Sequence, residues 1–130
     1  MKSEYARTSR VENFFNMLLT KYAVSNNLFL ELPVTMKKEW EDLVLIDVGS
    51  GINRGAIYSY SVNIFLYARP KGELQQKNVK VLDRMETLLE KAIKENHDAH
   101  YVVKLNWRDA DYDSTRNFHY NVINIETTVI

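Results

Sequence analysis

The glycine-rich stretch DVGSGINRGA, residues 47–56, is the part of the sequence whose composition first suggests chemistry. Glycines at fixed spacing bind phosphate when their loop opens a helix, as in the motifs G-x-x-x-x-G-K-[ST] and G-x-G-x-x-G. Gly49 and Gly55 are too far apart for the first motif, and an Ala-Ile pair follows them in place of Lys-Ser or Lys-Thr. The second motif fails at its third glycine, where Arg54 stands. Neither phosphate motif is complete.

The residues after this stretch predict a strand and not a helix. Residues 57–68 alternate with a period of two, so that one face is apolar and the other is partly polar. A phosphate loop needs a helix N-terminus that faces the anion, and the alternation leaves no such helix. We therefore predict that the glycines turn the chain between two paired strands, where a positive φ suits glycine.

Three aspartates with alternate spacing form the second candidate. Asp109, Asp111 and Asp113 match positions one, three and five of a calcium-binding loop. Ser114 stands at position six, where glycine is needed, and Tyr120 stands at position twelve, where a bidentate glutamate is needed. The pattern favours a solvated loop between two strands, with weak calcium binding as the alternative.

The remaining reactive side chains form no recognised catalytic pattern. His97 and His100 flank the expected end of a helix, and His119 lies on an expected strand, without the spacing of metal ligands. The absence of cysteine excludes thiolate catalysis, disulfides and Cys-based zinc sites. Ser50 lies between two glycines, but the spacing is not that of the nucleophile elbow G-x-S-x-G. We therefore predict no catalytic residue, no metal site and no cofactor, and hence a protein that is not an enzyme.

The composition is that of one globular domain, residues 1–130. Hydrophobic residues make up 45% and charged residues 26%, which is enough apolar material for a core. The 17 basic and 17 acidic residues cancel, so no net charge attracts nucleic acid or an anionic membrane. No segment reaches the roughly 20 apolar residues of a spanning helix, and the first residues do not resemble a signal peptide. We expect a soluble protein made in a cytoplasm, with no membrane partner and no sequence-specific nucleic acid.

Two amphipathic helices and five strands are expected to position the candidate residues. Apolar side chains three and four residues apart predict helices over residues 11–22 and about 75–95. Apolar or alternating runs predict strands over residues 28–34, 43–48, 57–68, 101–107 and 118–130, with a polar loop over residues 108–117.

Two of these strands carry a finer pattern. Alternation in the fourth strand predicts that Tyr101, Val103, Leu105 and Trp107 face inward. The alternation of the last strand slips after Val122, which fits either a bulge or a strand that is covered on both faces partway along.

The order α-β-β-β-α-β-β predicts an α+β fold. Only one connection between strands contains a helix, so most strand pairs should be antiparallel, with a long β-hairpin over residues 43–68. Both helices are expected to pack on the sheet.

This order of elements resembles that of phage tail terminator proteins and related head–tail neck (tail completion) proteins. Those are small α+β domains with an N-terminal helix, a sheet with a long hairpin, a second helix and C-terminal strands. The resemblance extends over residues 11–22, 43–68, 79–93 and 101–130, and it concerns layout rather than a diagnostic motif.

The resemblance implies a non-enzymatic virion protein, made in the host cytoplasm, that forms a ring of identical subunits at the neck or tail end. Its partners would be further copies of itself and other phage neck or tail proteins. It also implies that hairpin tips and loops contact the neighbours. The candidate interface residues are Gly49, Ser50, Gly51, Asn53, Arg54 and Gly55 in one loop, and Asp109, Asp111 and Asp113 in the other.

Two other functions stay open from the sequence. The chain could be a small cellular binding module that uses the sheet or an adjacent cleft for a ligand. It could also be a metal-dependent hydrolase that uses His97, His100 and the aspartates of residues 109–113.

Overall fold

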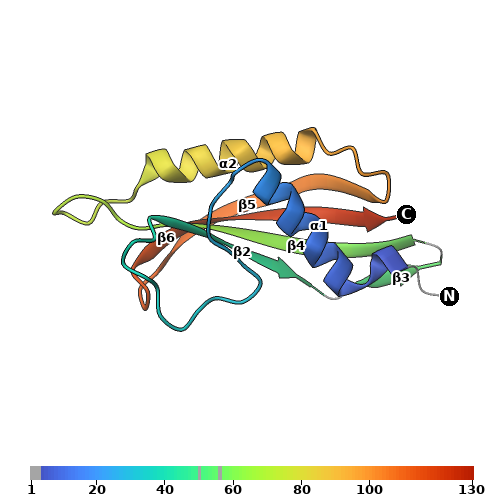
Figure 1. Ribbon diagram of the computed structural model, residues 1–130, viewed down its shortest axis with the longest axis horizontal. Coiled ribbons are helices and arrows are strands. Elements are labelled where there is room, and N and C mark those ends of the chain that lie inside the picture. Colours follow the sequence, from blue (N-terminus) through green and yellow to red (C-terminus); the bar gives the residue numbers. More distant parts are fainter. Residues whose placement is uncertain (1–3, 50, 56) are drawn as a thin grey trace.

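The computed structural model describes residues 4–49, 51–55 and 57–130, and the side chain of Arg54 lies outside that description. Figure 1 shows one long sheet whose helices lie on the same side of it. The helical elements are η1 (Glu4–Ala6), α1 (Thr8–Lys21) and α2 (Val79–Lys94). The strands are β1 (Leu28–Phe29), β2 (Asp42–Val48), β3 (Ile52–Arg54), β4 (Ile57–Ala68), β5 (Tyr101–Asp113) and β6 (Phe118–Val129).

The predicted α+β fold is confirmed. The sheet has the strand order β1-β2-β4-β6-β5, with β3 paired to β4 beyond the end of β2. Every pair is antiparallel except β1 with β2. The structure adds the short strand β3 to the predicted order, and it shortens the first expected strand to two residues.

Both helices form where the apolar spacing predicts them, because each has one apolar stripe. Helix α1 buries Val11, Phe14, Phe15, Leu18 and Leu19. Helix α2 begins after Asn78, whose side chain accepts a hydrogen bond from the Val81 amide at 3.4 Å and so caps the helix. The stripes of both helices pack on one face of the sheet and form the main core.

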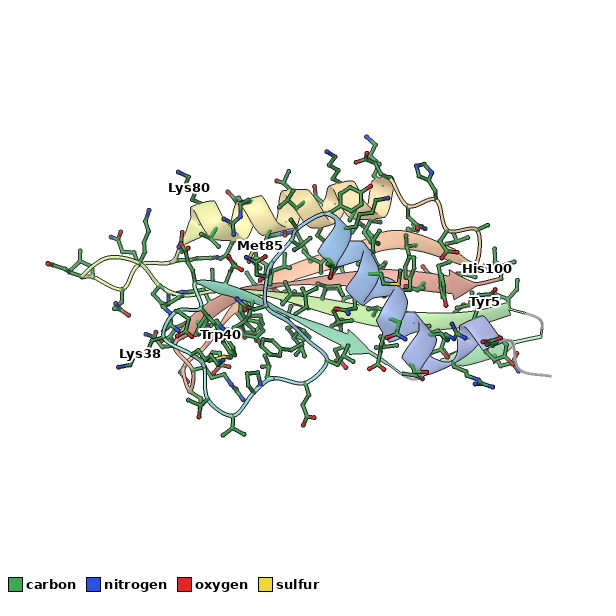
Figure 2. All side chains as sticks on the ribbon, in the orientation of Figure 1. Tyr5, Lys38, Trp40, Lys80, Met85 and His100 are labelled. Atoms are coloured by element: carbon green, nitrogen blue, oxygen red, sulfur yellow. The ribbon has the colours of Figure 1, made fainter. Side chains whose placement is uncertain are left out.

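The opposite face of the sheet, here the helix-free face, carries no helix among the described residues. Part of it is covered by the connection between β1 and β2, residues 30–41, which passes across β2, β4 and β6 (Figure 2, near Trp40). This connection buries Leu43, Tyr67 and Phe118 under a second, smaller apolar cluster. Strand β6 is thus covered on both faces near its start, which explains the slip in its apolar pattern, and no register shift occurs between β4 and β6.

The prediction of a polar loop over residues 108–117 is wrong. Strand β5 continues to Asp113, and only residues 114–117 form the turn to β6. The outer half of β5 lies at the edge of the sheet with its side chains exposed, so no core imposes an apolar alternation on it.

The inward position predicted for Trp107 is also wrong. The register between β5 and β6 shifts between Leu105 and Trp107, with Asn106 as the extra residue of a β-bulge. Leu105 pairs with Ile125 of the core, whereas Trp107 pairs with Asn124 of the helix-free face. The Trp107 side chain is consequently 50% exposed.

Candidate interface on the hairpin end and the edge strand

The glycine-rich segment turns the chain between strands, as predicted. Strand β3 pairs with the first residues of β4, with Arg54 opposite Ile57. Gly55 has a φ of 75°, which glycine adopts without strain. Since β4 follows, no helix N-terminus is present to bind a phosphate at this point. Ser50, one of the predicted interface residues, lies outside the described residues.

Gly51 is needed for a different reason, which is close packing. A β-carbon at this position would lie 2.6 Å from the ring of Tyr60, a contact that real structures do not tolerate. Tyr60 is buried, and its hydroxyl donates a hydrogen bond to the carbonyl oxygen of Ala6. The hairpin end is therefore held against the sheet and against η1. The exposed groups of this end include Ile52 and Asn53.

Asp109, Asp111 and Asp113 lie on one face of β5 and not in a loop. They pair with Val122, Tyr120 and Phe118, so all three belong to the helix-free face. Asp113 accepts hydrogen bonds from the backbone amide of Arg116 and from its guanidinium, both at 3.1 Å. This pair fixes the turn between β5 and β6.

The other two aspartates bond to their own strand. The Asp109 carboxylate accepts a hydrogen bond from the Ala110 amide at 2.8 Å, and the Asp111 carboxylate accepts one from the Tyr112 amide at 2.8 Å. Amides of alternate residues on an edge strand point away from the sheet, where they could pair with another chain. The two carboxylates occupy such amides, so they limit strand addition along this part of the edge.

The aspartates also act on two tyrosines beside them. Burial, followed by the charge of Asp113 and by Tyr120, raises the pKa of Tyr67 to about 12, with a smaller opposing effect of Arg116. Burial, followed by Asp111 and the two other aspartates, raises the pKa of Tyr120. Both phenols therefore stay neutral to a higher pH than an exposed tyrosine would.

The raised pKa of Tyr67 predicts a loss of stability in alkali. Between pH 10 and 12 the unfolded chain releases the Tyr67 proton, whereas the folded chain keeps it. The stabilisation is complete below pH 10 and is lost as the pH rises through 12. We expect urea denaturation to show a steeper fall in unfolding free energy over this range for the wild type than for Tyr67→Phe. Equal slopes for the two proteins would contradict the shift.

An amide network lies on the helix-free face beside Trp107. The side-chain amide of Asn124 donates hydrogen bonds to the Ser61 hydroxyl at 2.9 Å and to the Asn63 carbonyl at 2.7 Å. Its own carbonyl accepts one from Asn106 at 3.0 Å. Asn124 is buried, so the network connects β4, β6 and the bulge of β5.

These residues were not predicted as part of a site. One signal was available in the sequence, because Asn63 and Asn124 interrupt strands that are otherwise rich in β-branched and aromatic residues. The contact between them depends on the register of β4 with β6, which the sequence alone does not give.

The two predicted interface segments do not meet within one subunit. The hairpin end adjoins the start of β4, whereas the turn after Asp113 adjoins the end of β4 (Figure 1). A strand of twelve residues is roughly 40 Å long, so the segments lie at opposite ends of the sheet. Contact between them is possible only between two copies of the chain.

The residues of the hydrolase alternative are also far apart. His100 stacks on Tyr5 with ring centroids 3.7 Å apart, at the hairpin end (Figure 2). Nine residues of extended chain, roughly 30 Å, separate His100 from Asp109. Among residues 4–49, 51–55 and 57–130, no three His, Asp or Glu side chains lie close enough to hold a metal ion.

A cleft of about 440 Å³ lies between α1 and the connection from α2 to β5. Its apolar floor includes Phe14 and Leu18. Arg10, Lys21 and Asp98 are among its polar lining residues. The cleft mixes both charges, so it does not select an anion or a cation by charge alone.

Comparison of the sequence with protein-family models and with curated proteins gives no match in either case. No helix in the described part of the chain is long and apolar enough to cross a membrane.

Proposed function

We propose that the chain is a non-enzymatic structural protein of a phage virion, which forms a ring at the head–tail neck or at the tail end. The observation that carries this proposal is the long strand β5, which leaves a row of backbone groups at an open sheet edge. Its helix-free side also carries a half-exposed tryptophan. Exposed edges and large aromatic side chains are typical of surfaces that bind other proteins.

The arrangement of the two predicted segments suits a ring. A ring of identical subunits needs two different surfaces on each subunit, which meet head to tail. The hairpin end and the acidic part of the edge strand are two such surfaces, and they lie towards opposite ends of the sheet. The layout of the elements, which resembles that of tail terminator and neck proteins, favours the same function.

Light scattering on the purified protein tests the proposal. A large closed oligomer is the expected result, either for the chain alone or after addition of the neighbouring neck or tail protein. A protein that stays monomeric at high concentration and with that partner would contradict it. Genes for portal, capsid or tail proteins beside the gene for this chain would support the phage assignment.

Reversal of one charge at the hairpin end should weaken the ring. Arg54 belongs to the hairpin end, and the opposite segment carries Asp109 and Asp111, so an attractive pair between neighbours is expected. We expect Arg54→Glu to shift the oligomer towards smaller species in sedimentation, without a change in thermal stability. Lys80→Glu, an exposed change on α2, is the matched control and should leave the oligomer intact. An unchanged oligomer in Arg54→Glu would remove this pair from the interface.

A small cellular binding module is the second candidate, and the cleft beside α1 is the observation that favours it. In that case the protein would bind a small ligand as a monomer. A ligand screen with the wild type and with Met17→Trp separates this function from ring assembly. The tryptophan would narrow the cleft from its exposed rim, so it should weaken ligand binding without changing the oligomer.

A further inference from the structure

The direction of the backbone amides along β5 can be assigned from two hydrogen bonds and the position of the bulge. The Ile130 amide donates to the carbonyl of His100 at 3.0 Å, so the backbone of His100 faces β6. The backbone N–H and C=O groups of successive residues in a strand point to opposite sides of that strand. Those of Tyr101, Val103 and Leu105 therefore point to the open edge. The extra residue Asn106 reverses this alternation, so beyond the bulge the even-numbered residues point their backbone groups to the open edge. Ala110 is one of them, which agrees with the hydrogen bond from its amide to Asp109.

Both ends of this open edge are closed by other groups. At the start of β5, the Tyr101 amide donates to the carbonyl of Asp98 at 3.2 Å, and the Asn96 side chain donates to the Tyr101 carbonyl at 2.9 Å. At the far end, Asp109 and Asp111 occupy the amides that follow them. The segment in between, residues 103–108, is here named the β5 window. Among the described residues, no side chain caps the amides of Val103 or Leu105.

The β5 window has apolar side chains on its flanks. Val102 and Trp107 are exposed on the helix-free face, and Leu105 is exposed on the helix side of the sheet. An added strand would cover these groups, which otherwise remain in water. The window therefore offers main-chain pairing together with apolar contacts.

Within residues 4–49, 51–55 and 57–130, no strand pairs with the outer side of β3, which forms a second edge on the opposite side of the same sheet. Arg54 pairs with Ile57 next to the turn, so the backbone N–H and C=O groups of Arg54 point to β4. Those of Asn53 consequently point to the outer side of β3. Ile52 and Ile57 are exposed on the helix-free face, the same face as Val102 and Trp107. The outer edges of β3 and of the β5 window therefore both carry exposed apolar side chains on the helix-free face.

We propose that β3 of one copy of the chain pairs with the β5 window of the next copy, so that the sheet continues from subunit to subunit. This inference rests on the proposed ring and names a contact different from the pair of Arg54 with Asp109 and Asp111. With β3 antiparallel to β5 and Asn53 opposite Leu105, position 54 lies opposite Lys104, so an unchanged oligomer in Arg54→Glu is compatible with this contact. The edges lie on opposite sides of the sheet, so the contact is head to tail and leaves one free edge of each kind for a further copy. Asp109 and Asp111 set the end of the pairing, because the amides beyond the window are already occupied.

Disulfide trapping tests the contact directly, since the chain contains no cysteine. Two single-cysteine proteins, Asn53→Cys and Leu105→Cys, are mixed and oxidised. At both positions the backbone groups point to the open edge and the side chain lies on the helix side of the sheet. Pairing of β3 with the β5 window would bring the two Cα atoms within disulfide range. We expect a crosslinked pair only in the mixture, and Val103→Cys in place of Leu105→Cys tests the adjacent register. Tyr112→Cys, beyond the window, is the matched control and should not crosslink with Asn53→Cys.

The outcomes separate this contact from the ring itself. Absence of a crosslink at both Val103 and Leu105 overturns the contact, even when light scattering shows a closed oligomer. Crosslinks of Leu105→Cys with itself also overturn it, because they would indicate a two-fold pairing of β5. A crosslink in the mixture together with an open filament supports the contact and contradicts the closed ring.

A backbone substitution gives an independent readout. Leu105→Pro removes an outward amide, whereas the pairing of β5 with β6 does not use that amide. Ala110→Pro removes an outward amide that bonds to Asp109 and not to a neighbouring chain, so it serves as the control for a proline in the same strand. We expect at least a tenfold weaker association for Leu105→Pro than for Ala110→Pro, at comparable thermal stability. Equal association of the two variants would overturn the contact.

Discussion

Replacement of Phe15 by alanine is expected to lower the free energy of unfolding by about 3–5 kcal/mol. Phe15 lies on α1 and has no exposed surface. Its ring packs edge to face against Phe14, with ring centroids 5.0 Å apart. The truncation removes apolar surface from the core and leaves a cavity between α1 and the sheet, which the surrounding strands cannot close. Urea denaturation of the wild type and the variant measures the effect.

Met17 provides the control on the same helix. Its side chain is 71% exposed, so Met17→Ala should change the unfolding free energy by no more than about 0.5 kcal/mol. A loss of stability in Met17→Ala as large as that in Phe15→Ala would mean that a different face of α1 packs on the sheet.

Replacement of Asn124 by alanine is the second large effect, with an expected loss of about 2–3 kcal/mol. Asn124 is buried and hydrogen-bonds Ser61, Asn63 and Asn106. Alanine leaves these groups without their partner in the middle of the sheet. It also frees Asn106, so the bulge and the adjacent Trp107 should become more mobile. Urea denaturation measures the loss, and the fluorescence anisotropy of the tryptophans reports the change at the bulge.

Glu126→Ala is the matched control for this variant. Glu126 lies two residues away on the same face of β6, and it is exposed. We expect a change within about 0.5 kcal/mol. If Asn124→Ala were no more destabilising than Glu126→Ala, the amide network would not contribute to the stability of the sheet.

The elements with one apolar face could be predicted from the sequence. Strand β4 has the predicted bounds, Ile57–Ala68, because it is central and its alternate residues enter the core. The two helices follow their apolar stripes for the same reason, although α2 begins at Val79, after its Asn78 cap.

The edge strand could not be predicted in the same way. From Arg108 to Tyr112, the side chains of β5 are exposed on both faces, so these residues resemble those of a loop. What holds this segment extended is pairing with β6, a contact between distant parts of the chain. The inward prediction for Trp107 failed because a bulge changes the phase of alternation without any mark in the local composition.

The candidate site could likewise be predicted from the sequence only in part. The sequence indicated the hairpin end and the three aspartates by residue type. It did not indicate that Asp109 and Asp111 bind amides of their own strand, or that β3 forms a second edge. Those features follow from register and from the direction of backbone groups, which are properties of the paired strands.

The single extra residue at position 106 has a consequence for how this chain can tolerate length changes. Removal of Asn106 would join Leu105 directly to Trp107, which pair with the adjacent residues Ile125 and Asn124, so residues 107–113 would keep the faces that they present now. A deletion within a paired strand ordinarily moves every later side chain to the other face, but here Trp107 and the three aspartates would stay on the helix-free face. The variant would lose the hydrogen bond from Asn106 to Asn124 while keeping the register of β5 with β6.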